Sequence, residues 1–530
     1  MKKLGLIILI LSLIGGVSAL SYSTVLKDND NSSIQDLINN AQPGGTINLE
    51  NKNYTGEGNY SITVNKSITI NGNGAIINAQ QKGVIFNVSN INNSVSLNNM
   101  NLINGNNSSG GAINNKGNLT INNVNFTGNT ADRYGGAIYT EKNSVLHVSN
   151  SQFKNNVANS TSSLKQGEYK EGGAIYSGNY SVLSVESSSF DGNFAEEGGA
   201  IYNDQKSVSH VSNSQFKNNV ANSTSSPKSD DGYKEGGAIY SGNYSVLSVE
   251  SSFFDSNFAE EGGAISNYAD NGSVKSSVFT DNKAYKLDPS WGDDGSGGAI
   301  RNVKSLSVVD SNFTRNSAPV DGAISNAGSS SILIVSGSVF TENSAKSKIW
   351  SSGGAIDNTG YATITDSEFN NNYAAVTNDS SSSNSGAVCN NAKMTIVRST
   401  FNNNSAVDGG AIKNQNFYGV SELNISDSTF NKNIGKNYGG AIYNVDAKLT
   451  IINTKFIGNT CNATNKTPDN GGGAVYNKNG DVTIKNSYFE DNFANGRDGG
   501  GICNYGSLNV QGTHFDNNKA TGGGGGIWNY

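Results

Sequence analysis

The tetrapeptide Gly-Gly-Ala-Ile recurs about every thirty residues in this chain, and a second motif, Phe-x-x-Asn, keeps step with it. Self-similarity at a fixed period is typical of stacked repeats, in which one unit cannot bury its apolar face alone. The two motifs are first complete at Gly110 and Phe126, and degenerate copies reach Gly524. We therefore predict a solenoid, which offers long ladders of side chains more readily than one closed pocket.

The residues between the two motifs alternate as they do in strands. Val or Ile stands five residues before the phenylalanine in all fourteen copies of Phe-x-x-Asn, as Ile121 does before Phe126. Period-two spacing with β-branched residues predicts half-buried strands. Each repeat supplies three short strands, at Ala-Ile-x-Asn, at Leu-x-Val and at x-Phe. We expect an all-β parallel β-helix of about 17 coils, stacked about 4.8 Å apart.

The glycines and asparagines that recur in each repeat have structural explanations. A tight corner needs a positive φ or a close approach of neighbouring coils, and glycine permits both. Asn stands two residues after the motif Ile in most copies, for example Asn115, Asn302 and Asn444. Its amide can bond to the coil above, so we expect ladders of asparagines. Ligand binding by these asparagines is the less favoured alternative.

The two ends of the chain differ from the repeats. Met1–Ala19 has two lysines, an apolar run and a small-residue cleavage site, which together predict a secretory signal. Residues 20–50 are predicted to be an N-terminal cap, with a short helix at Ser33–Asn40, and residues 51–530 the β-helix. The last coil, at Tyr530, is expected to be uncapped. We expect no membrane-spanning segment in the mature chain.

The composition argues against nucleic-acid binding and gives little support to catalysis. The net charge is −7, and about −9 without the two signal lysines, so no basic surface is expected. Asp293 and Asp294 are the nearest candidates for a catalytic carboxylate pair, but they lie in an insertion where solvated loop acids are the better interpretation. No catalytic residue, metal site or cofactor is predicted.

The histidines and cysteines likewise form no predicted site. His147 and His210 precede the Val of the second strand, so both should point outward. Cys389, Cys461 and Cys503 lie in different coils, and no disulfide framework is expected among them. They are interpreted as small buried residues, or alternatively as a sign of an oxygen-poor setting.

The residue after the motif Ile is the strongest candidate for a binding role. It is Tyr139, Tyr176, Tyr202 and Tyr240 in four consecutive coils, and Ser, Arg, Asp or Lys in several others. We expect this position to face outward, so the four tyrosines would form an exposed aromatic stripe. Cross-strand stacking that stabilises the sheet is one interpretation, and a strip that binds sugars or proteins is the other.

A tandem copy and a row of long loops complete the pattern. Val148–Ile201 is nearly repeated at Val211–Ile265, which indicates duplication of a two-coil block. Such tolerance of added coils fits a spacer or display rod better than an enzyme with one fixed site. The loops after Phe153, Phe216 and Phe279 are long, and we expect them to project from one edge as a row.

Gly-Gly-Ala-Ile together with Phe-x-x-Asn resembles the repeats of chlamydial polymorphic outer membrane proteins, over about residues 34–530. The Asn-rich style and the signal look like the adhesin-like surface proteins of methanogenic archaea. The resemblance implies a right-handed parallel β-helix and a secreted or cell-surface adhesin that binds glycans or proteins. In a departure from that family's pattern, we expect no autotransporter barrel, wall-binding segment or anchor with these repeats. A structural cell-envelope rod and, less favoured, a polysaccharide lyase or hydrolase remain the alternatives.

Overall fold

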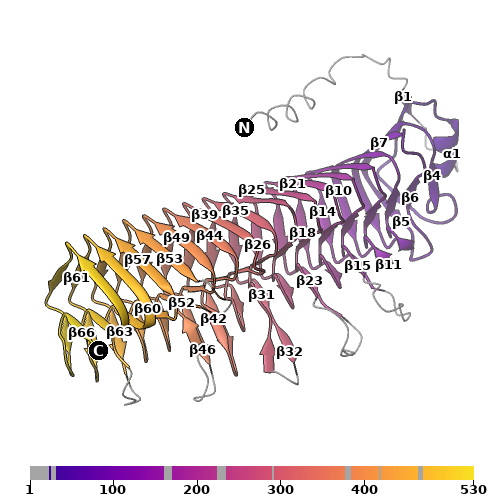
Figure 1. The fold of residues 1–530 in the computed structure, drawn as a ribbon. Helices are drawn as coiled ribbons and strands as arrows, with labels where there is room; N and C mark the ends of the chain where they lie inside the picture. The colour runs from indigo at the N-terminus through magenta and orange to yellow at the C-terminus, as the bar shows by residue number, and fades with distance from the viewer. Residues whose placement is uncertain are drawn as a thin grey trace, which may run out of the picture.

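The chain folds into a long rod of stacked coils, shown by a computed structural model (Figure 1). The structure describes residues 23–25, 32–159, 170–223, 234–288, 292–376, 383–416, 419, 421–463 and 470–530. Seventeen parallel strands of the described chain form the Ile-x-Asn row, from β4 (Ile62–Val64) to β66 (Ile527–Asn529). The parallel β-helix and its number of coils are therefore confirmed. The predicted signal, Met1–Ala19, lies outside the described residues.

One coil illustrates the repeat. It contains β16 (Ile175–Ser177), β17 (Val182–Glu186), β18 (Ser189–Asp191) and β19 (Phe194–Ala195). Each strand pairs in register with its counterpart in the next coil. The first three are the strands that the sequence predicts. The fourth belongs to a separate fifteen-strand sheet, and at two residues it is too short for an alternation to reveal it.

The interior consists of ladders of identical side chains. The phenylalanine rings of Phe-x-x-Asn stack from Phe126 to Phe515, with centroids 4.5–4.9 Å apart. The aliphatic residues at the two preceding inward positions, such as Leu183 and Val185, are also fully buried. Because every coil buries its apolar face against the next, one contiguous core runs along the rod.

Two ladders of asparagines run beside this apolar core. In the first, each Asn of Phe-x-x-Asn donates its Nδ2 to Oδ1 of the next, from Asn129 to Asn518, at 2.8–3.0 Å. In the second, the Asn of Ile-x-Asn does the same from Asn267 to Asn529, at 2.7–2.8 Å. The second ladder is the one that the sequence predicts, and it is confirmed from Asn267 onward. Asn115, also predicted to belong to it, pairs with Thr140 of the next coil and donates its amide to Val145 O instead.

The two glycines of each motif have different tasks. Gly172 has φ +71°, the left-handed conformation that glycine adopts most readily. A Cβ on Gly173 would lie 2.1 Å from the carbonyl oxygen of Gly199 in the next coil. Positive φ and close approach, the two explanations offered from the sequence, therefore apply to successive residues of one corner.

The first coil is covered by the predicted helix. Helix α1 (Ile34–Asn40) begins with a capping box between Ser33 and Asp36, and buries Ile34, Leu37 and Ile38. On the strand edge that it covers, the amide of Gln35 accepts from Thr63 N at 2.7 Å and donates to Thr63 O at 3.2 Å. The helix thus satisfies backbone groups of β4 that no earlier strand pairs with.

The predictions for the isolated polar residues also hold. His147 and His210 are exposed on the outer face, and the three cysteines are buried and unpaired. Burial raises the pKa of the Cys461 thiol to about 12, so it stays protonated. Among the described residues, no helix is long and apolar enough to cross a membrane.

Candidate functional site

The four tyrosines form a stack, but it is largely covered. We call Tyr139, Tyr176, Tyr202 and Tyr240 the tyrosine stack, whose successive ring centroids are 5.2, 5.4 and 4.7 Å apart. Tyr176 and Tyr202 are only 8% and 9% exposed, and the outer two are partly buried. The expected exposed stripe is therefore wrong in its exposure, although the rings do lie outside the apolar core and stack between coils.

The cover comes from the residue that precedes each Gly-Gly. Tyr134 holds this position in one coil and packs on both Tyr139 and Tyr176, with centroids 6.0 and 4.8 Å apart. In the next four coils the position is glutamate, and Glu171 bridges to the backbone of Tyr134 and of Glu197. Since the sharp Gly-Gly corner folds this segment back toward the strand that follows it, the residues on either side of the corner meet.

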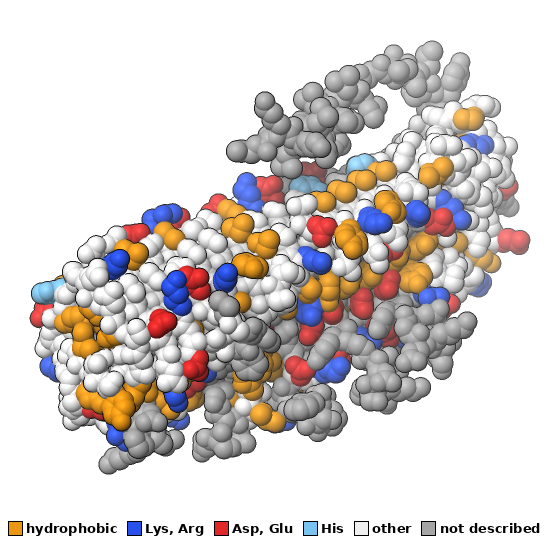
Figure 2. Space-filling model, in the orientation of Figure 1, with side chains coloured by type: hydrophobic (Ala, Val, Ile, Leu, Met, Phe, Trp, Pro, Cys, Tyr) orange, Lys and Arg blue, Asp and Glu red, His pale blue; other side chains and the backbone are white. Residues whose placement is uncertain are grey.

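We call Glu171, Glu197, Glu235 and Glu261 the acidic row. Burial raises the pKa of Glu171 to about 9, and that of Glu197 and Glu261 to about 8, and nearby carboxylates add to each shift. The carboxyls of Glu171 and Glu197 are therefore protonated over much of the neutral range. Figure 2 shows acidic and hydrophobic side chains running side by side along one face of the rod.

Cations and hydroxyls complete the surroundings of the acidic row. Arg301 Nε lies 2.7 Å from Glu261 Oε2, and its guanidinium also contacts Glu235 at 3.4 Å and the hydroxyl of Tyr268. Tyr176 donates its hydroxyl to Asp204 at 2.7 Å. Desolvation raises the pKa of both tyrosines, so they remain neutral donors. The arrangement suits a structural column of hydrogen-bonded groups.

The same two positions stay polar and covered further along the rod. Asp357 is buried and accepts from Ser352 Oγ at 2.5 Å and from Asn391 Nδ2 at 3.0 Å. Burial raises its pKa to about 6, although these hydrogen bonds oppose the shift. Two coils after Asp357, at the same position, Lys413 donates to Asp408 at 3.0 Å. The column is therefore a recurrent feature of the fold.

The residues considered for chemistry do not come together with this column. Asp293 and Asp294 lie on β33 (Gly292–Asp294), which forms a hairpin with β32 (Lys286–Asp288) that projects from the rod (Figure 1). Asp294 Oδ1 accepts from its neighbour Gly295 N at 2.8 Å. The side chain of Asp293 and most of the loops after Phe153 and Phe216 lie outside the described residues. Within the described ranges, no group of three or more His, Cys, Asp or Glu is arranged to hold a metal ion.

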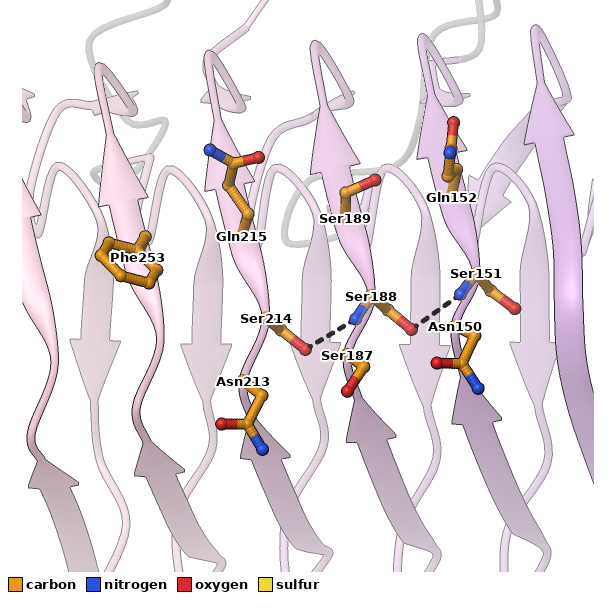
Figure 3. A pocket seen from close by; sticks show the side chains of 10 residues that line it. All are labelled: Asn150, Ser151, Gln152, Ser187, Ser188, Ser189, Asn213, Ser214, Gln215 and Phe253. Atoms are coloured by element: carbon orange, nitrogen blue, oxygen red, sulfur yellow. Dashed lines mark hydrogen bonds between the residues drawn. The ribbon is translucent and has the colours of Figure 1, made fainter.

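A feature that the sequence reasoning missed lies on the outer face, where each coil bends between its second and third strands. We call it the polar hollow; it has a volume of about 410 Å³ (Figure 3). Its floor is a ladder of buried serines, in which Ser188 Oγ accepts from Ser151 N and Ser214 Oγ accepts from Ser188 N, both at 3.1 Å. Its rim is lined by the following exposed or partly exposed residues: Asn150, Gln152, Ser187, Ser189, Asn213, Gln215 and Phe253.

The hollow arises from side-chain size at one register position. Gln152, Ser189, Gln215 and Phe253 pair in order across four coils. The small Ser189 between two glutamines leaves space, and Phe253 closes one end with 54% of its surface exposed. The residue before each motif phenylalanine carries this signal in the sequence, and it could have been read there.

Comparisons with known proteins agree with the repeat assignment. Segments 123–141, 187–204, 398–415, 427–445 and 512–530 match the Chlamydia polymorphic membrane protein repeat. The repeat is therefore similar to that family over about a sixth of the chain. No curated protein matches the chain. The comparison does not bear on the resemblance to archaeal adhesin-like proteins.

Solved structures similar to this chain include alginate lyases and an adhesin. The PL6 family alginate lyase AlyGC is 11% identical, with a TM-score of 0.33, over 94% of this chain and 89% of that one. The Streptococcus pneumoniae surface protein and adhesin PfbA is 10% identical, with a TM-score of 0.24, over 93% of this chain and 95% of that one. TM-scores this low carry no argument about the fold, which is defined here by the strand pairing of the chain itself.

Proposed function

We propose that the protein is an adhesin-like protein of the cell surface, which binds glycans or proteins of other cells, a host or the matrix and does not transform them. The match of five segments to the Chlamydia polymorphic membrane protein repeat supports a membrane or surface association. The rod form supports display, because a solenoid carries its surface away from its point of attachment.

The observation that carries this proposal is the contrast between inner and outer polar groups. Inside, amides such as those of Asn156 and Asn193 bond to the next coil and have no capacity left for a ligand. Outside, the polar hollow presents amides and one exposed phenylalanine to solvent. A few convergent polar groups beside an apolar one are typical of binding sites.

The proposal is tested by binding of the fluorescently labelled full-length protein to whole cells, immobilised glycans and extracellular matrix proteins. We expect saturable binding that the unlabelled protein displaces. Circular dichroism and thermal unfolding establish that the protein used is folded. Absence of saturable binding to every one of these surfaces by folded protein would contradict an adhesin.

A structural cell-envelope rod is a second candidate, which the duplicated block favours. Val182, Val208 and Val246 follow one another in register across the duplication, so the added coils lengthen the rod without disturbing it. Deletion of residues 148–210 joins equivalent positions and shortens the rod by two coils. A rod would then show altered envelope dimensions with no ligand lost, whereas an adhesin whose site lies in this block would lose binding.

A further inference from the structure

We propose that the polar hollow binds an uncharged oligosaccharide, lying along the rod across the coils of Gln152, Ser189, Gln215 and Phe253. This inference rests on the proposed function and specifies its ligand and its site. Neutral sugars present hydroxyl groups that both donate and accept, and ring faces that are apolar. The hollow has a counterpart for each of these properties.

The hydrogen-bonding groups of the hollow match hydroxyl-rich ligands. A side-chain amide offers two N–H donors and one acceptor oxygen. It can therefore donate to a sugar hydroxyl oxygen and accept from a sugar O–H. Gln152 and Gln215 are two coils apart, about 9.6 Å, and flank the space left by Ser189. Figure 3 draws hydrogen bonds only among the serines of the floor, so these amides make none to the other side chains drawn.

The lining of the hollow carries no charged side chain. Charged side chains of both signs flank the lining: Glu186 directly precedes Ser187 in the chain, and Lys154, Asp191 and Lys217 lie two residues beyond Gln152, Ser189 and Gln215. In that second row Lys217 and Asp255 form an ion pair at 3.3 Å. A polyuronate, a sulfated glycan or a nucleic acid would therefore be bound without a compensating cation in the hollow. An uncharged ligand has no such cost.

Phe253 supplies the apolar counterpart. The duplicated segments Val182–Phe190 and Val246–Phe254 are identical except at one position, where Ser189 of the first copy is replaced by Phe253. The replacement leaves more than half of a large apolar side chain in water at the end of a polar hollow. A ring so placed can stack on the apolar face of a pyranose, as aromatic rings do at binding surfaces.

A peptide is a poorer occupant on the same geometry. Extended peptides bind sheets mainly by main-chain hydrogen bonds to a free edge. Here the backbone is already paired: Ser189 N donates to Ser151 O, Gln215 N to Ser188 O and Phe253 N to Ser214 O, each at 2.9 Å. Side-chain groups alone remain available in the hollow.

The test is isothermal titration of the full-length protein and its variants with cellotetraose, mannotetraose and N-acetylchitotetraose, with tetragalacturonate as the charged counterpart. Phe253→Ser recreates the sequence of the first copy, which already forms a coil in this chain, so the variant is expected to fold. Gln215→Ala removes one amide from the rim. Tyr244→Ser is the matched control, because Tyr244 is a 62% exposed aromatic in the same coil outside the hollow.

We expect at least one neutral tetrasaccharide to bind, and Phe253→Ser and Gln215→Ala each to weaken it roughly ten-fold, with Tyr244→Ser unchanged. Equal affinities of the parent, Phe253→Ser and Gln215→Ala overturn the inference, as does binding of tetragalacturonate alone or of none of the sugars. If cell binding persists in Phe253→Ser while the sugars fail to bind, this inference falls and the adhesin proposal stands. If the parent protein binds neither the sugars nor cells, the adhesin proposal itself is overturned.

Discussion

Asn156 and Asn193, the final residues of Phe-x-x-Asn in two neighbouring coils, are joined twice. The backbone N–H and the side-chain Nδ2 of Asn156 both donate to Oδ1 of Asn193, at 3.0 Å each. The second proton of the Asn156 amide goes to the carbonyl of Phe126 in the preceding coil, at 3.1 Å. The Asn156 side chain therefore connects three coils, and none of its own polar atoms is left unpaired.

Replacing one member of this ladder should weaken the rod locally. In Asn282→Ala, the backbone and side-chain donors of Asn257 lose their acceptor, and Phe254 O loses its donor. We expect a loss of about 2–4 kcal/mol in the stability of the adjoining coils. Hydrogen exchange of the amides in those coils measures it, and Asn312→Ala, on the exposed face of β36 (Asn312–Thr314), is the control. Equal protection in both variants would refute the role of the ladder.

Asn203 should behave in the opposite way. It occupies the Ile-x-Asn position between coils that carry Ser177 and Ser241, and neither atom of its buried amide has a hydrogen-bond partner. The two serines bond instead to Ser181 and Ser245. We expect Asn203→Ser to leave the melting temperature unchanged or to raise it, because an unsatisfied buried amide costs stability.

The control for Asn203 is the same substitution inside the intact part of that ladder. Asn358→Ser removes hydrogen bonds to Asn326, Asn390 and the carbonyl of Lys393. Its melting temperature should fall by several degrees while that of Asn203→Ser does not. A fall of equal size in both variants would show that Asn203 has a stabilising role that its contacts do not explain.

The Gly-Gly corner gives a steric prediction. A Cβ on Gly199 would lie 2.1 Å from Gly237 O, so Gly199→Ala must push two coils apart and should destabilise by 3 kcal/mol or more, about the upper range for single substitutions. Gly458 has φ +60° but only Lys432 Cγ at 3.6 Å nearby. Gly458→Asn is therefore expected to be tolerated, since Asn already holds a left-handed position at Asn155. Thermal unfolding of the two variants distinguishes steric cost from backbone cost.

The interior of the rod could be predicted from the sequence because each inward position repeats. Equivalents of Val185, Phe190 and Asn193 recur at fixed spacing in fourteen coils, and this spacing alone indicates which side chains point inward. The burial of Tyr176 could not be predicted in that way. It depends on how far the segment that ends at Glu171 folds back, and that segment varies in length between coils.

The polar hollow could be predicted from the sequence only in part. The size difference between Gln152 and Ser189 is visible in the sequence once the coils are aligned. The bend of the backbone that forms the hollow is not visible in the sequence. It depends on left-handed conformations at Asn150 and Ser187, with φ +50° and +49°. Asn often adopts that conformation, but Ser seldom does, so composition gives no reliable sign of it.

The tyrosine stack should matter more to stability than its outward position suggests. Tyr202 lies between Tyr176 and Tyr240, nearly parallel to both. Tyr202→Ser loses this stacking and the buried ring, so we expect a loss of about 3–5 kcal/mol, as for a buried aromatic residue. Tyr202→Phe keeps the ring and should melt near the parent. Binding of sugars or proteins by these tyrosines stays a prediction, which binding assays on the folded Phe variant can test.

The acidic row predicts that stability declines as the pH rises. The pKa of Glu171 is raised from 4.5 to about 9, so between these values the folded protein holds a proton that the unfolded chain has released. Stability therefore falls with pH across this window, and the contribution is complete only below about pH 4.5. Glu197 and Glu261 act in the same direction up to about pH 8.

Melting temperatures at pH 5 and pH 9 measure the effect. We expect a lower value at pH 9, and a smaller difference between the two pH values in Glu171→Gln, because the amide stays neutral throughout. Glu368→Gln, on the exposed face of β45 (Glu368–Asn370), should leave the difference unchanged. Since ionised carboxylates in adjacent coils also repel one another, Glu171→Gln should raise the melting temperature at pH 9. A variant that melts lower than the parent at pH 9 would mean that the ionised Glu171 is stabilised by a partner, and that the acidic row is held by charge rather than by protonation.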